Sequence, residues 1–74
     1  MTKIIQITVM RTERQVDEGT MGFHDWVTKS EPYLEFINRV TDEANDLISK
    51  GYRIISISYP SENIGVISCL KSHD

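Results

Sequence analysis

Apolar and polar side chains alternate along residues 3–11, KIIQITVMR. A period of two is typical of a β-strand, because successive side chains of a strand point to opposite faces. Ile5, Ile7 and Val9 share an apolar face. The segment therefore predicts a strand whose other face is mixed and carries Ile4, Gln6, Thr8 and Met10.

The period changes over residues 32–50, where apolar side chains recur every three or four positions. Such spacing predicts an α-helix with one continuous apolar stripe. Ser30 or Glu31 with Pro32 favours a helix start, and Lys50 with Gly51 favours a helix end. The stripe consists of Tyr33, Phe36, Ile37, Val40, Ala44, Leu47 and Ile48.

Alternation returns over residues 52–59 and 64–71, which predict two further strands. The turn-forming residues of PSEN between them favour an antiparallel hairpin. In the first of these strands, strict alternation assigns Ile55, Ile57 and Tyr59 to one face. The opposite face then carries Ile54, Ser56 and Ser58.

The element order is β-α-β-β with a long loop over residues 12–31, and it predicts one α+β domain over residues 1–74. One amphipathic helix should cover one face of a three-stranded sheet, with the first two strands parallel or joined by a right-handed crossover within that sheet. The second half of the hairpin could present either of two pairs to the helix. The expected partners of the stripe are Ile5, Ile7, Val9, Ile55, Ile57 and either Ile67 with Cys69 or Val66 with Leu70.

The sheet face away from the helix is too apolar for a purely solvated surface. It is expected to carry Ile4, Met10 and Ile54 beside polar side chains. A chain of 74 residues builds a small core and often needs oligomerisation for stability. We therefore predict a homo-oligomer whose interface contains Ile4, Met10 and Ile54.

The composition argues against several classes of function. A net charge of −3 argues against a dedicated nucleic-acid surface, because phosphate binding needs clustered Lys and Arg. No apolar run is long enough for a membrane span and no signal sequence is visible, so we expect a soluble cytoplasmic protein. The single cysteine excludes an internal disulfide, and the two histidines lack the spacing of a structural metal site. We expect no metal and no cofactor.

The helix leads into the hairpin through a distinctive corner. Its residues are Leu47, Gly51, Tyr52, Ile54, Ile55, Ser56, Ile57 and Ser58. This pattern resembles a group of small bacterial and phage domains of unknown function, in which a helix ending in a Gly-aromatic corner leads into a hairpin of alternating hydrophobic residues and serines. The resemblance covers about residues 34–71, implies a compact β-α-β-β fold, and implies no settled activity.

The long segment 12–31 holds the only tryptophan and is the candidate site. One interpretation makes Phe23, Trp26 and Val27 a second core layer. A second makes Phe23 and Trp26 a stacking wall for a planar anionic ligand bound by arginines. A third makes the segment a protein-binding surface. The candidate ligand-binding residues are Arg11, Arg14, Phe23, His24 and Trp26.

A catalytic set is not apparent. His24 and Asp25 are sequence neighbours without a nucleophile motif, and the EGTMG glycines lack the Gly-Lys-Ser/Thr of a phosphate loop. Cys69 is expected to be an inert core residue, and His73 and Asp74 a frayed end.

These observations rank three functions. The first is a non-catalytic, oligomeric binding module, such as a phage or mobile-element protein that sequesters an anionic, nucleotide-like small molecule. The second is an inhibitor or adaptor that binds a host protein through residues 12–31 and the exposed sheet face. The third and least favoured is a small enzyme.

Overall fold

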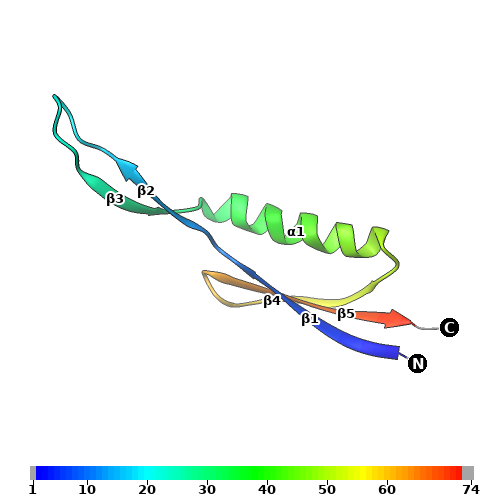
Figure 1. The fold of residues 1–74 in the computed structure, drawn as a ribbon. Coiled ribbons are helices and arrows are strands. Elements are labelled where there is room, and N and C mark those ends of the chain that lie inside the picture. The colour runs from blue at the N-terminus through cyan, green and yellow to red at the C-terminus, as the bar shows by residue number, and fades with distance from the viewer. Residues whose placement is uncertain (1, 73–74) are drawn as a thin grey trace.

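The computed structural model describes residues 2–72, and the side chains of residues 3–71. It contains one helix and five strands in two sheets (Figure 1). The α+β class is confirmed, but the prediction of a single three-stranded sheet is wrong, because a second sheet forms between the first strand and the helix. The elements are β1 (Thr2–Met10), β2 (Glu13–Asp17), β3 (Trp26–Ser30), α1 (Tyr33–Ser49), β4 (Arg53–Ser61) and β5 (Ile64–Ser72).

The main sheet has the strand order β1-β5-β4 and is antiparallel throughout. The chain leaves β1, forms the second sheet and α1, and returns as β4 on the far side of β5. Strands β1 and β4 therefore run in the same direction without pairing, and β5, which forms the hairpin with β4, lies between them. The segments predicted as strands over 3–11, 52–59 and 64–71 are all present in this sheet.

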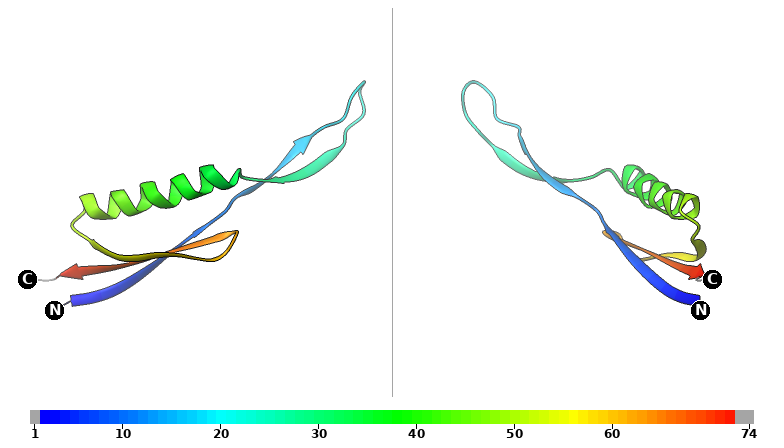
Figure 2. Two further views of the ribbon diagram at one scale, coloured as in Figure 1. Left: turned by 180° about the vertical axis from the view of Figure 1, so that it is seen from behind. Right: turned by 45° about the vertical axis from the view of Figure 1, so that its right-hand side comes forward.

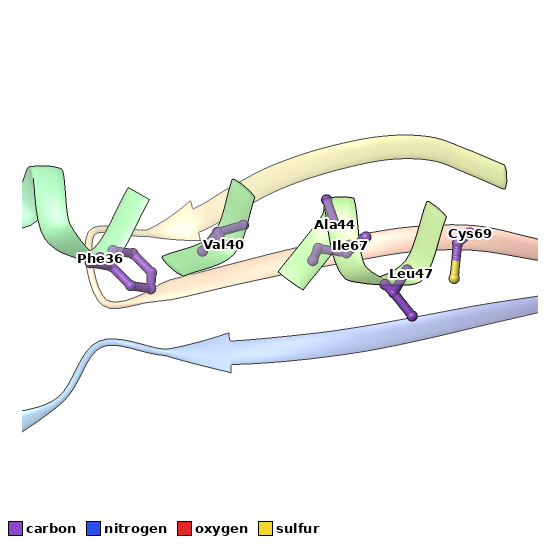
Figure 3. Close-up of a cluster of buried hydrophobic side chains, with 6 residues drawn as sticks. All are labelled: Phe36, Val40, Ala44, Leu47, Ile67 and Cys69. Atoms are coloured by element: carbon purple, nitrogen blue, oxygen red, sulfur yellow. The ribbon is translucent and has the colours of Figure 1, made fainter. Parts of the chain in front are cut away.

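The core lies between α1 and one face of the main sheet (Figure 3). The helix contributes Phe36, Val40, Ala44 and Leu47, which are members of the predicted stripe. On β5 the alternative is settled, because Ile67 and Cys69 are fully buried under the helix. The flanking side chains that pack against this core include Ile5, Ile7, Val9, Ile37, Tyr52 and Ile54.

Ile54 lies on the helix side of the sheet, so its predicted place on the opposite face is wrong. The reason is a register shift between Ile54 and Ser56, where β4 carries one more residue than β5. Such a bulge interrupts the alternation of side chains along a strand. Ile54 consequently packs against the core, while Ile55 is half exposed.

The helix ends as the sequence predicts, in a Schellman motif. The Tyr52 N–H donates to the Leu47 carbonyl and the Gly51 N–H donates to the Ile48 carbonyl, both at 3.0 Å. Gly51 adopts a φ of 93°, a conformation that a glycine accepts without steric cost. The chain is thereby turned directly into β4.

The molecule is strongly elongated, with principal extents of 63 × 22 × 17 Å (Figure 2). Its radius of gyration is 17.4 Å, whereas a compact domain of this length has a value of about 11 Å. The second sheet causes the difference, because it projects away from the helix and main sheet. We call the helix and main sheet the body, and residues 13–30 the arm.

Candidate functional site

The arm is a two-stranded antiparallel hairpin, so the prediction of a loop over residues 12–31 is wrong. Strands β2 and β3 pair from Glu13 opposite Ser30 to Asp17 opposite Trp26. Val16 and Val27 form the one aliphatic cross-strand pair. With so few apolar positions, the short strands show no alternation that sequence reasoning could detect.

The end of the arm is a tight turn over Thr20–Phe23. The Phe23 N–H donates to the Thr20 carbonyl at 3.1 Å, and both central residues have positive φ, 55° at Met21 and 82° at Gly22. These are the features of a type I′ turn, which favours hairpins. A glycine suits the second position, but a methionine at the first is held in a strained conformation.

Asp17 organises the loop behind this turn. Its carboxylate accepts the N–H of Gly19 at 2.9 Å and the N–H of Asp25 at 3.0 Å, and it lies 2.6 Å from His24 Nδ1. The contact with His24 and then the two backbone donors hold the pKa of Asp17 below its usual value. The bond to Gly19 is an Asx-turn, and the Asp17-Glu18-Gly19 sequence is the signal that could have revealed it.

Three large apolar side chains surround the end of the arm and face solvent. Met21 is 93% exposed, Phe23 79% and Trp26 62%. We call these residues the tip cluster. The interpretation of Phe23, Trp26 and Val27 as a second core layer is therefore wrong, because the arm carries all three away from the body. The His24 ring lies nearly parallel to Trp26, with centroids 6.1 Å apart.

Acidic groups border the tip cluster. Asp17 ends β2, and Glu18 and Asp25 lie in the loop that follows it. Glu18 forms an ion pair with Lys29 on β3. The outer part of the arm thus combines exposed apolar side chains with a majority of acidic groups. This arrangement disfavours a phosphate-rich surface as its partner.

The arm is fixed to the body at its base by Glu31. The Glu31 carboxylate accepts two hydrogen bonds from Arg39 of α1, from Nε at 2.7 Å and Nη2 at 2.8 Å. The same Nη2 donates to the Met10 carbonyl at 2.7 Å. Glu31 also accepts from the N–H and hydroxyl of Thr12, both at 3.3 Å.

Glu31 is well covered, with only 9% of its side chain exposed. The bonds from Arg39, with those from Thr12, outweigh the cost of burial and lower the pKa of Glu31 to about 2. This two-pronged ion pair joins the end of β1, the arm and the helix. Sequence reasoning missed Glu31 and Arg39, which are eight positions apart and carry no motif.

The predicted ligand-binding residues do not converge in one place. Phe23, His24 and Trp26 lie near the end of the arm, whereas Arg11 lies at its base. There the Arg11 Nε donates to the Glu31 carbonyl at 2.6 Å, and the Arg11 guanidinium lies over the Tyr33 ring. Asp17, the cross-strand neighbour of Trp26, lies six positions along the extended chain from Arg11, a distance of about 20 Å.

Arg14 occupies an intermediate position opposite Lys29. With Glu13, Gln15 and Thr28 it lines an open depression of about 270 Å³. No aromatic side chain borders that depression. One chain therefore does not combine the arginines and the aromatic rings into a single pocket.

The remaining candidate groups are Cys69, the possible metal ligands, and His73 with Asp74. Cys69 is buried, with its Sγ 3.6 Å from the Ile5 carbonyl. Within residues 2–72, no group of three or more His, Cys, Asp or Glu side chains is placed to hold a metal ion. His73 and Asp74 lie outside the described residues.

Ile4 and Met10 lie on the sheet face away from the helix, as predicted, and are 67% and 64% exposed.

Within the described residues, no helix is both long enough and apolar enough to cross a bilayer. Comparison with protein-family models, curated proteins and solved structures gave no match. The resemblance to small bacterial and phage domains stays a prediction.

Proposed function

We propose that this chain is a non-catalytic binding protein that attaches to a protein partner through the tip of its arm. The observation that carries the proposal is the tip cluster of Met21, Phe23 and Trp26, which is presented to solvent on a projecting hairpin. Aromatic residues are favoured anchors of protein interfaces, because they bury a large area at low conformational cost. The partner surface that fits is an apolar groove with a basic border.

The strained turn supports this proposal. Met21 adopts a left-handed conformation, which costs free energy for a residue with a Cβ atom. Asparagine or glycine would form the same turn more easily. Strain of this kind is found where a side chain serves a purpose besides stability. Here the turn places an apolar side chain at the outermost point of the arm.

The connection at the base of the arm supports it as well. Glu31 and Arg39 lock the arm to the helix, and Asp17 holds the loop near the tip. A preorganised arm loses less conformational entropy on binding than a flexible loop does. The tip is therefore suited to rigid insertion into a groove.

Site-specific photo-crosslinking in extracts of the source cells tests the proposal. A photoreactive residue replaces Met21 in one variant. In a control it replaces Leu34, another strongly exposed apolar residue, which lies on α1. We expect one discrete protein adduct from position 21 and none from position 34. Excess unlabelled wild type should suppress the adduct, whereas excess Phe23→Ala/Trp26→Ala should not. Equal adducts at both positions, or competition by the double variant, would contradict the proposal.

Sequestration of an anionic, nucleotide-like molecule is the second hypothesis, and the stacked rings of His24 and Trp26 favour it. A thermal-shift screen against nucleotides separates the two. A ligand at a hundred times its dissociation constant should stabilise the chain by roughly 2.7 kcal/mol. A nucleotide-induced shift that Trp26→Ala abolishes would favour the small-molecule hypothesis over the protein partner.

A further inference from the structure

The two edges of the main sheet differ in a way that points to a partner. Strand β4 is interrupted by two register shifts, between Ile54 and Ser56 and between Ser58 and Ser61, and it contains Pro60. Bulges and prolines are devices that prevent an edge strand from pairing with another chain. The β4 edge is therefore protected.

Strand β1 has none of these devices. It pairs with β5 in unbroken register from Thr2 to Met10, and its sequence TKIIQITVM contains no proline and one charged residue, Lys3. Its other edge has no partner strand among residues 2–72. A long, regular and largely uncharged edge is a template for an added strand.

We infer that a second copy of this chain pairs with the β1 edge, antiparallel and about a two-fold axis, to give a continuous six-stranded sheet. A second copy is the occupant that the composition of β1 favours, because the strand is self-complementary. With Ile7 opposite itself, Ile4 lies opposite Met10 of the other copy, and Gln6 lies opposite Thr8. On the helix side, Ile5 then lies opposite Val9.

Between residues 4 and 10, this register places apolar side chains beside apolar ones on both faces and polar beside polar on the outer face; Lys3 falls opposite Arg11 only at the ends. Ile4 and Met10, the most exposed apolar residues of the body's sheet, gain neighbours. The half-buried Ile5, Ile7 and Val9 are covered further, which extends the core across the axis. Both helices lie on the same side of the joined sheet.

The inference does not depend on the partner proposed for the tip, because β1 and the tip cluster are separate surfaces.

Charge substitutions at the two edges test the inference. Gln6→Lys/Thr8→Lys places lysines opposite lysines across the proposed axis, and like charges directly opposite each other destabilise a strand pair. Ser56→Lys/Ser58→Lys adds the same charges to the same sheet face at the β4 edge. Sedimentation equilibrium at micromolar concentration measures the mass, and circular dichroism verifies that each variant is folded.

We expect wild type and the β4-edge variant to be dimers and the β1-edge variant to be a monomer of 8.5 kDa. Mixing the β1-edge lysine variant with Gln6→Glu/Thr8→Glu should restore a dimer, which separates lost pairing from lost folding. A monomeric wild type would overturn the inference. Monomers from both edge variants would indicate face-to-face packing instead, and dimers from both would indicate an interface elsewhere. Failure of the charge-swapped mixture to associate would also overturn it.

Discussion

The body and the arm are stabilised by different kinds of contact. In the body, four side chains of α1 and two of β5 are buried against one another, and they are all apolar. The arm contributes no residue to that core. It depends on a β-ladder and on two carboxylates, Asp17 near the tip and Glu31 at the base. The same chemical change should therefore have effects of very different size in the two regions.

The largest effect is expected from removing one phenylalanine from each region. Phe36→Ala empties a fully buried position and should destabilise the protein by about 3–5 kcal/mol, enough to unfold a domain of this size. Phe23→Ala removes an exposed ring and should change the stability by less than about 0.5 kcal/mol. Urea denaturation followed by far-ultraviolet circular dichroism gives both values. Equal losses would show that the tip packs against a core.

A smaller effect is expected at the junction between the regions. Glu31→Gln removes the charge that binds Arg39, so the arm should loosen while the body stays folded. Hydrogen exchange followed by mass spectrometry should show faster exchange in residues 13–30 and unchanged exchange in α1. Thr12→Ala, which removes only one weak bond, is the matched control.

The same junction predicts a pH dependence. The folded pKa of Glu31, about 2, lies below its ordinary value of 4.5. Its contribution is therefore fully present above about pH 4.5 and is lost as the pH falls toward 2. The difference in arm protection between wild type and Glu31→Gln should shrink over this range. A difference that persists at pH 2 would mean that the ion pair is not what holds the arm.

The smallest effect is expected at the turn. Met21→Asn places a residue that accepts positive φ at the strained position and should stabilise the arm by about 1 kcal/mol. Exchange in the amides of the arm should become slower, with no change in the body. Met21→Leu, which keeps the strain and the apolar character, should exchange like the wild type. Faster exchange in Met21→Asn would show that the side chain itself stabilises the arm.

The body can be predicted from the sequence more fully than the arm can. The stripe from Phe36 to Leu47 and the alternation in β1 were visible because burial on one side imposes a period on the sequence. The arm buries neither of its faces, so only Val16 and Val27 marked its strands. The bulge that moves Ile54 to the core side was hidden for a related reason, since a single extra residue alters the geometry without altering the composition.

Part of the candidate site is visible in the sequence. Phe23 and Trp26 stand out as unusual residues of the segment, because large apolar side chains are rare in a polar connection, and both are exposed on the arm. Their grouping with Arg11 failed, since proximity in sequence becomes a separation of about 20 Å once the chain is extended. Asp17 and Glu31 were missed because their roles come from backbone and side-chain donors that only the folded chain brings together.

The position of Trp26 has a spectroscopic consequence. It is the only tryptophan of the chain, it lies on the arm, and it is largely exposed. Intrinsic fluorescence excited in the indole band therefore reports on the arm, and it should change little when the core unfolds. The emission should lie at long wavelength, be quenched readily by acrylamide, and shift to the blue when a partner covers the tip. Without any added label, the protein carries a reporter of the tip through which we propose that it binds a partner.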